Sequence, residues 1–129
     1  MADMDRPTIL IVDDHAAFRA HARVLLTAAG FEVVADAADG RAALDQAGRL
    51  HPAIVLLDVQ LPDIDGFAVA RELVDGPSPP AVVLVSTRDA GDYGRRLRDS
   101  GAAGFISKSR LSGDTLHAVL RTSTKEASR

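Results

Sequence analysis

Short apolar segments alternate with amphipathic segments along the whole chain. Apolar runs that are rich in β-branched residues are typical of strands buried on both faces, and period-two alternation is typical of a half-buried strand. Such segments predict five strands, at residues 8–12, 31–35, 53–57, 81–85 and 104–107.

The segments between these strands predict five helices. Apolar residues recur at helical spacing from Phe18 to Leu26, and Gly30 provides a C-terminal stop. The other helices are expected at 41–50, 67–74, 90–100 and 113 to about 125, although two glycines weaken the fourth.

Five strands that alternate with five helices define an α/β fold. Parallel strands need crossover connections, which are usually helices that cover the faces of the sheet. The sequence therefore predicts a doubly wound, five-stranded parallel sheet with five helices (flavodoxin-like).

Composition bounds the chain to one domain. It has 129 residues, of which 47% are hydrophobic and 4% aromatic, so one core built mainly of aliphatic side chains is expected. We expect the domain to span residues 7–125, with flexible termini at 1–6 and 126–129.

Charge and cysteine content exclude several classes. The net charge of -3 provides no basic surface for nucleic acid, and the absence of cysteine excludes disulfides and thiolate metal sites. The acidic N-terminus is not a signal peptide, and no apolar stretch reaches the roughly 18 residues of a membrane span. We expect a cytoplasmic protein that neither spans a membrane nor binds DNA by itself.

Three aspartates follow two of the most apolar strands. Asp13 and Asp14 come directly after 8–12, and Asp58 comes directly after 53–57. Ligands of open parallel sheets bind beyond the carboxyl ends of the strands. Carboxylates gathered there repel one another unless a cation joins them or some are protonated. Mg²⁺, which prefers oxygen ligands, suits this cluster.

Two more polar residues end strands at the same edge. Ser86 follows Val85, and Lys108 comes just after the strand at 104–107. A carboxylate, a hydroxyl and an ammonium beside a cation form a cradle for a phosphoryl group. Asp58 can attack phosphorus to form an acyl phosphate. Mg²⁺ and Lys108 then offset the charge on the transferring oxygens, and Ser86 donates to one of them.

Taken together, these motifs resemble the receiver domain of two-component response regulators. The resemblance covers about residues 7–125, nearly the whole chain. The residues that match the motifs of the family are Asp13, Asp14, Asp58, Pro62, Gly66, Ser86, Phe105 and Lys108.

The resemblance implies a role for each acidic residue and for its neighbour. Asp58 is the expected phosphoacceptor. Asp13, Asp14 and Asp58 are expected to hold Mg²⁺, with the backbone carbonyl of Gln60 as a further ligand. By position alone, two residues beyond Asp58 and Ser86, the side chains of Gln60 and Arg88 could flank the phosphoryl group and modulate its hydrolysis, or they could simply be surface residues.

The resemblance also implies a switch. Ser86 occupies the position of the switch hydroxyl and Phe105 that of the switch aromatic, with Lys108 binding the phosphoryl group. In the family, phosphorylation draws the hydroxyl inward and the aromatic ring follows. This change remodels the face made by the fourth helix, the fifth strand and the fifth helix.

The implied partners are a sensor histidine kinase or a phosphotransfer protein, and an unidentified downstream protein. Homodimerisation through the switched face is a further expectation. The chain is expected not to be an enzyme beyond taking a phosphoryl group and slowly hydrolysing its own acyl phosphate. The Asp-Asp-His15 start, with Phe18 and Arg19 behind it, resembles receivers that precede a helix-turn-helix output domain.

One position departs from the family pattern. Ser109 follows Lys108, where the family has proline after a cis peptide bond. A cis bond before a residue other than proline costs roughly 2.5–4 kcal/mol. Either the site bears that cost, or the bond is trans and Lys108 sits differently.

Other interpretations stay open for the whole chain. It could be a phosphorylation-independent interaction module, or the receiver fragment of a DNA-binding transcriptional regulator. A third alternative is a small phosphatase with an aspartyl nucleophile. Such enzymes carry a second acid two residues after the nucleophile, and Gln60 stands there instead.

Single residues have alternatives as well. The aspartates and Ser86 could act as helix caps, and Phe105 could be a core residue only. His15 is expected on the surface rather than at the metal. The basic cluster on the fourth helix (Arg95, Arg96, Arg98) is expected to be solvated or to face a partner.

Overall fold

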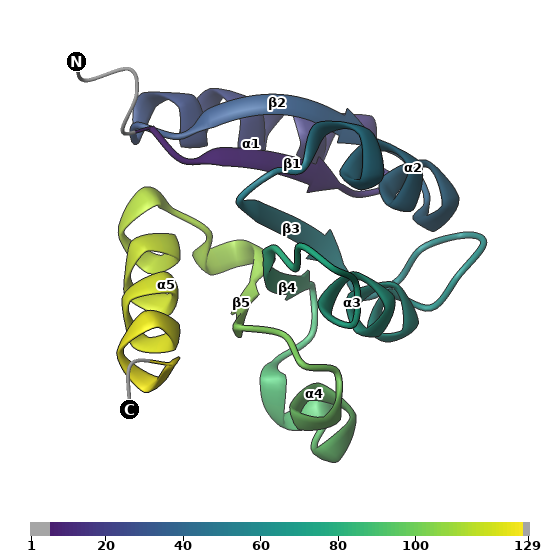
Figure 1. Ribbon diagram of the computed structural model, residues 1–129. Helices are drawn as coiled ribbons and strands as arrows, with labels where there is room; N and C mark the ends of the chain where they lie inside the picture. The colour runs from purple at the N-terminus through teal and green to yellow at the C-terminus, as the bar shows by residue number, and fades with distance from the viewer. Residues whose placement is uncertain (1–5, 128–129) are drawn as a thin grey trace.

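Five strands form a single parallel sheet in the computed structural model, which describes residues 6–127. The strand order is β2-β1-β3-β4-β5, so β3 is central and β5 lies at an edge (Figure 1). All four neighbouring pairs are parallel, which confirms the predicted fold class. The strands are β1 (Thr8–Val12), β2 (Glu32–Ala37), β3 (Ile54–Asp58), β4 (Ala81–Ser86) and β5 (Gly104–Ser107).

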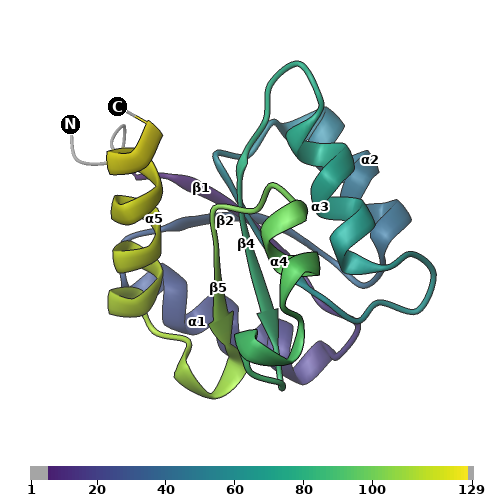
Figure 2. The ribbon, with the colours of Figure 1, turned by 90° about the horizontal axis from the view of Figure 1, so that it is seen from below.

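Helices cover both faces of the sheet (Figure 2). The helices α1 and α5 supply residues to the core on one face, and α2 and α3 supply residues to the core on the other, where α4 also packs. The helices are α1 (Ala16–Ala28), α2 (Gly40–Leu50), α3 (Gly66–Val74), α4 (Arg95–Asp99) and α5 (Gly113–Ala127).

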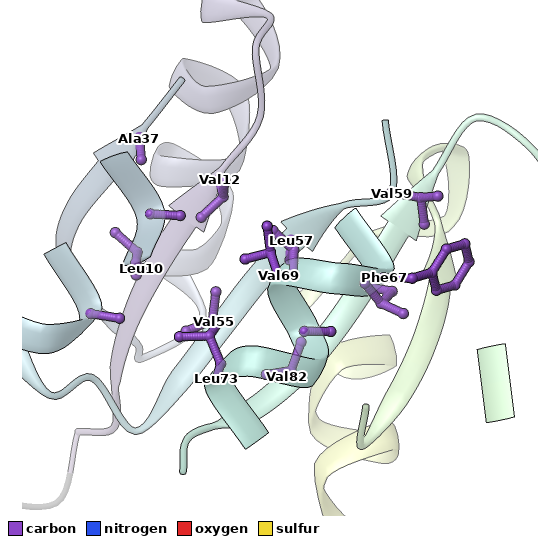
Figure 3. Close-up of a cluster of buried hydrophobic side chains, with 14 residues drawn as sticks. Leu10, Val12, Ala37, Val55, Leu57, Val59, Phe67, Val69, Leu73 and Val82 are labelled. Atoms are coloured by element: carbon purple, nitrogen blue, oxygen red, sulfur yellow. The ribbon is translucent and has the colours of Figure 1, made fainter. Parts of the chain in front are cut away.

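The pleat of the strands divides the core into two clusters. In β1, Leu10 and Val12 lie in the cluster under α2 and α3, here called the α2–α3 core (Figure 3), whereas Ile9 and Ile11 lie in the α1–α5 core on the other face. The same alternation continues in β3 and β4, because successive side chains of a strand point to opposite faces. Both faces are apolar, as the predicted buried strands require.

The expected helix at 90–100 is wrong in part. One 3₁₀ turn, η2 (Ala90–Asp92), and the short helix α4 replace it, with Tyr93 and Gly94 between them. Gly94 has φ +54°, a left-handed backbone conformation that glycine adopts without steric cost. A continuous helix cannot pass through this residue, so the segment splits there.

The remaining boundaries agree closely with the expected ones. Helix α5 extends to Ala127, two residues beyond its expected end, and β2 begins one residue later than expected, after the buried Phe31. Of the termini expected to be flexible, residues 1–5 and 128–129 lie outside the described residues. Within the described range, the helices are too short or too polar to cross a membrane.

Candidate functional site

The predicted site residues meet at the carboxyl edge of the sheet. Asp58 is the last residue of the central strand β3 and pairs with Val85 in β4. The next residue of β4, Ser86, pairs with Ser107, which precedes Lys108. Because all strands are parallel, the carboxyl ends of β1, β3, β4 and β5 lie at one edge of the sheet. The arrows of β1, β3 and β4 in Figure 1 show this common direction.

An acidic cluster occupies this edge. Single ligand atoms of Asp13, Asp14, His15 and Asp58 all lie within 4.8 Å of one another. Asp13 is fully buried and Asp58 is 3% exposed, whereas Asp14 and His15 face solvent. His15 was expected on the surface, and its ring is exposed, but Nδ1 lies 3.1 Å from an Asp13 oxygen and 3.0 Å from an Asp14 oxygen.

Lys108 joins the two buried carboxylates. Its Nζ lies 2.5 Å from Oδ2 of Asp13 and 3.1 Å from Oδ2 of Asp58. The ammonium also sits 4.6 Å from the ring centre of Phe18, a cation–π distance. The Lys108–Ser109 peptide bond is trans. Lys108 therefore reaches Asp58 without the cis bond of the family pattern.

Burial and neighbouring charges shift the pKa values at this site. Burial raises the pKa of Asp58, and the nearby Asp13 carboxylate raises it further, against the lowering effect of the Gln60 N–H and Lys108. Burial alone would lower the pKa of Lys108, but the hydrogen bond to Asp13 and the charge of Asp58 raise it. The lysine is thus held in its charged form between two carboxylates that repel each other.

Contacts from α1 and from the strand ends hold Asp13 in place. Its backbone N–H donates to the carbonyl of Ala37, and its own carbonyl accepts a 2.7 Å hydrogen bond from Arg19. Arg19 also lies 3.8 Å from Asp36 in β2. Sequence reasoning assigned no site function to Phe18 or Arg19. The sequence signal that could have pointed to them is their position, because both lie in the first turns of the helix that follows Asp13 and Asp14.

The loop after Asp58 is tied closely to the end of β3. The Gln60 N–H donates to Asp58 Oδ1 at 3.0 Å, and the Gly66 N–H donates to the carbonyl of Val59 at 2.9 Å. A Cβ atom at position 66 would lie 2.6 Å from that carbonyl oxygen. Only glycine allows α3 to begin this close to the loop after Asp58.

Asp63 connects the same loop to α2. Its carboxylate accepts hydrogen bonds from the backbone N–H groups of Gly40 and Arg41 at 2.8 and 2.9 Å. The Arg41 N–H, followed by that of Gly40, lowers the pKa of Asp63. A carboxylate at the N-terminus of a helix is favourable because the orphaned N–H groups and the helix dipole both attract it.

Ser86 lies beside the acidic cluster but does not join it. Ser86 is 1% exposed, and its Oγ lies 2.6 Å from the phenol oxygen of Tyr93. The half-buried Phe105 packs on the α2–α3 core, with its ring centre 5.9 Å from that of Tyr93. Sequence reasoning missed Tyr93, because nothing local links it to a residue seven positions earlier.

The two residues considered as modulators of hydrolysis lie at the protein surface. Gln60 and Arg88 are both exposed. The cluster on α4 is exposed, as expected, and Arg96 in addition contacts residues at the start of α3. Its guanidinium lies 2.5 Å from Asp65 and 4.6 Å from the ring centre of Phe67, and so connects α4 to α3.

The acidic cluster fits a divalent cation. The three carboxylates and the ammonium of Lys108 have a net charge of two negative units when all are ionised, and two of the carboxylates are buried. Mg²⁺ binds carboxylate oxygens and keeps several waters, for which the exposed side at Asp14 leaves room. Asp13, Asp14 and Asp58 would hold the ion.

Fold and site together define a class of protein. The chain is a doubly wound α/β domain with a buried aspartate at the end of its central strand. Further carboxylates and a lysine stand around that aspartate, an arrangement that suits the binding of a cation and of a charged group beside it.

Comparisons with known proteins identify the family. The model of the response regulator receiver domain matches residues 9–121, so the chain belongs to this family of two-component systems. It is 35% identical over 112 residues to the transcription regulator BvgA of Bordetella pertussis, covering 87% of this chain and 52% of that protein. The signal receiver domain of the response regulator NarL from Mycobacterium tuberculosis superposes with a TM-score of 0.81 at 32% identity, covering 92% and 97%.

A further relative is an enzyme. The chain is 39% identical over 119 residues to protein-glutamate methylesterase/protein-glutamine glutaminase 2 of Cereibacter sphaeroides, covering 90% of this chain and 33% of that protein. The chain therefore spans about half the length of BvgA and a third of the methylesterase. What it shares with both is the receiver domain.

Proposed function

We propose that the domain, at residues 7–125, accepts a phosphoryl group on Asp58 from a sensor histidine kinase or a phosphotransfer protein. One observation carries the proposal. The Asp58 carboxylate ends the central strand, and its Oδ2 lies 3.1 Å from Lys108, which also holds Asp13. A nucleophile, a cation-binding pair and an ammonium thus stand within reach of one phosphoryl group.

The chemistry is a transfer between two nucleophiles. An oxygen of the ionised Asp58 carboxylate forms a bond to phosphorus while the bond from phosphorus to the donor breaks, and the donor leaves with the bonding electrons. In hydrolysis, a water oxygen bonds to phosphorus while the bond from phosphorus to the Asp58 oxygen breaks, which releases phosphate, a proton and the free carboxylate. The pKa of Asp58 is raised from 3.8, so the ionised nucleophile is favoured as the pH rises through the shifted value.

The surrounding residues stabilise the transferring charge. When bound by Asp13, Asp14, Asp58 and the Gln60 carbonyl, Mg²⁺ supplies positive charge to the phosphoryl oxygens. Lys108 is already within hydrogen-bond distance of Asp58 and can donate to a phosphoryl oxygen.

The rim and the switch complete the proposal. The exposed side chains of Gln60 and Arg88 flank the entrance and adjust hydrolysis. Ser86 donates to the bound phosphoryl group, Phe105 follows it, and the face of α4, β5 and α5 changes shape. The added negative charge biases an existing equilibrium between two conformations.

The first test is the intact mass of the protein after incubation with acetyl phosphate and Mg²⁺. We expect one added phosphoryl group on the wild type and none on Asp58→Ala. Asp45→Ala is the matched control, because Asp45 is an exposed aspartate on α2, and it should be labelled like the wild type. Label on Asp58→Ala would contradict the assignment of the phosphoacceptor. An unlabelled wild type would favour an interaction module that works without phosphorylation.

The relatives support a proposal about the output of the domain. BvgA is a transcription regulator, and this chain matches about half of it. We therefore propose a signalling role in the cytoplasm that controls a downstream protein or an attached output domain, rather than DNA binding by residues 7–125 themselves. Dimerisation through α4, β5 and α5 on phosphorylation is part of the proposal, and sedimentation with and without acetyl phosphate tests it.

A further inference from the structure

The hydroxyl of Ser86 is engaged away from the acidic cluster. Its Oγ lies 2.6 Å from the Tyr93 phenol oxygen and accepts a hydrogen bond from the Arg88 N–H at 3.1 Å. Within the described residues, no hydrogen bond joins this hydroxyl to Asp58. Because Ser86 is buried, water does not replace the Tyr93 contact.

The pleat of the strands explains this direction. Ser86 follows Leu84 in the row of β4 that faces the α2–α3 core, whereas Asp58 follows Leu56 in the row of β3 that faces the α1–α5 core. Rows of opposite parity project from opposite faces of a sheet. For the Ser86 hydroxyl to reach a phosphoryl group on Asp58, it has to turn away from Tyr93.

We propose that Tyr93 is a positioning residue of this site, which holds the Ser86 hydroxyl while Asp58 is unmodified and releases it when the acyl phosphate forms. This inference rests on the proposed function of Asp58. Either hydroxyl can be the donor in this contact, and in both cases the contact holds the Ser86 Oγ away from Asp58. A phosphoryl oxygen is charged and accepts a stronger hydrogen bond than a neutral phenol, so the phosphoryl group wins the competition.

The surroundings of Tyr93 connect this exchange to α4. Its ring packs edge-on against Phe67, with centres 5.3 Å apart, and lies beside Phe105. Tyr93 is followed directly by Gly94, whose left-handed conformation separates η2 from α4. Phe105 has no polar side-chain atom and cannot form a hydrogen bond with Ser86, so this hydrogen bond is made by Tyr93. Loss of that contact frees the segment that leads into α4.

The chain offers a direct probe of this contact. Tyr93 is its only tyrosine, so protein labelled with ¹³Cζ-tyrosine gives one resonance that reports this phenol. Beryllofluoride with Mg²⁺ is the probe, because it imitates a phosphoryl group on a carboxylate. We expect the resonance to shift when beryllofluoride binds to the wild type. In Ser86→Ala it should start near the shifted position and move little, whereas Ser86→Thr keeps a hydroxyl and should respond like the wild type.

Affinity provides the second measurement. Tyr93→Phe removes the phenol oxygen and keeps the ring that packs on Phe67. Removing the competitor should tighten beryllofluoride binding about two- to tenfold, which is the worth of one neutral hydrogen bond. In a Ser86→Ala background the same substitution should have no effect. This non-additivity separates a role that acts through Ser86 from a general effect on packing.

Backbone amide shifts around Asp58 monitor binding itself. If those amides respond while the tyrosine resonance stays in place, the inference is wrong. It is also wrong if Tyr93→Phe changes the affinity equally with and without the Ser86 hydroxyl. If the folded wild type shows no more response than Asp58→Ala, the proposed function of Asp58 fails, and the inference fails with it.

Discussion

At the scale of single residues, the site is governed by how much negative charge is buried. Asp13 is fully buried, Asp58 is 3% exposed, and Lys108 is the cation within hydrogen-bond distance of both. A buried carboxylate is costly unless it is paired, and here one ammonium serves two of them. The raised pKa of Asp58 reflects this excess of buried negative charge over positive charge. A divalent cation, or the loss of the charge on Asp58, relieves the excess.

The first prediction at this scale is that Asp58→Asn stabilises the fold at neutral pH. The folded pKa of Asp58 is raised, so the folded state holds this proton more tightly than the unfolded state does. The stability from protonation is complete below the unfolded pKa of about 3.8 and is lost as the pH rises through the folded pKa. Asparagine stays neutral, so the variant avoids that loss.

Urea unfolding without divalent cations checks this prediction. The free energy of unfolding of Asp58→Asn should exceed that of the wild type at pH 7, and the difference should shrink as the pH falls toward 4. Asp45→Asn changes an exposed aspartate in α2 and should show no such difference. A wild type that is as stable as Asp58→Asn at pH 7 would mean that Lys108 fully compensates Asp58.

At the scale of elements, glycines determine how closely the helices approach the site. Gly66 starts α3 against the end of β3, and an added Cβ would lie 2.6 Å from the Val59 carbonyl oxygen. Gly48 lies in the last turn of α2, where an added Cβ would meet nothing within 4 Å. The two positions therefore have opposite tolerance for a methyl group.

The second prediction compares alanine at these two positions. Gly66→Ala should destabilise the fold by about 1–3 kcal/mol, the usual cost of overpacking, and should also slow phosphorylation, because the loop after Asp58 is displaced. Gly48→Ala should stabilise the fold by about 0.4–1 kcal/mol through helix propensity and a less flexible unfolded chain. Urea unfolding gives both values. A Gly66→Ala variant as stable as the wild type would show that α3 can shift without cost.

At the scale of the whole molecule, a bound cation links the site to folding. The carboxylates of β1 and β3 come together only in the folded sheet, so an ion that binds them stabilises the folded state by mass action. At one hundred times its dissociation constant, the ion adds about 2.7 kcal/mol.

The third prediction follows for Mg²⁺. The midpoint of thermal unfolding of the wild type should rise when Mg²⁺ replaces EDTA, and Asp13→Asn should lose most of this rise. Asp45→Asn, which keeps the cluster intact, should respond like the wild type. If Asp13→Asn gains as much from Mg²⁺ as the wild type, the ion binds elsewhere.

The sequence by itself determined the architecture and most of the candidate site. Continuous apolar runs and, for β2, an alternating pattern predicted the five strands of the sheet. Parallel strands end at one edge, so the residues that follow β1, β3, β4 and β5 could be placed together without coordinates. Asp13, Asp58 and Lys108 lie there in contact. These inferences succeed because they depend on local pattern and on strand direction.

The tertiary structure alone decided which polar groups are partners. It breaks the expected helix at Gly94, places Tyr93 on Ser86, and joins Arg96 to Asp65, 31 positions earlier. Contacts of this kind depend on the pleat of the strands, the path of a turn and the packing of one helix on another. No periodicity records them, because each joins segments that only the folded sheet brings side by side.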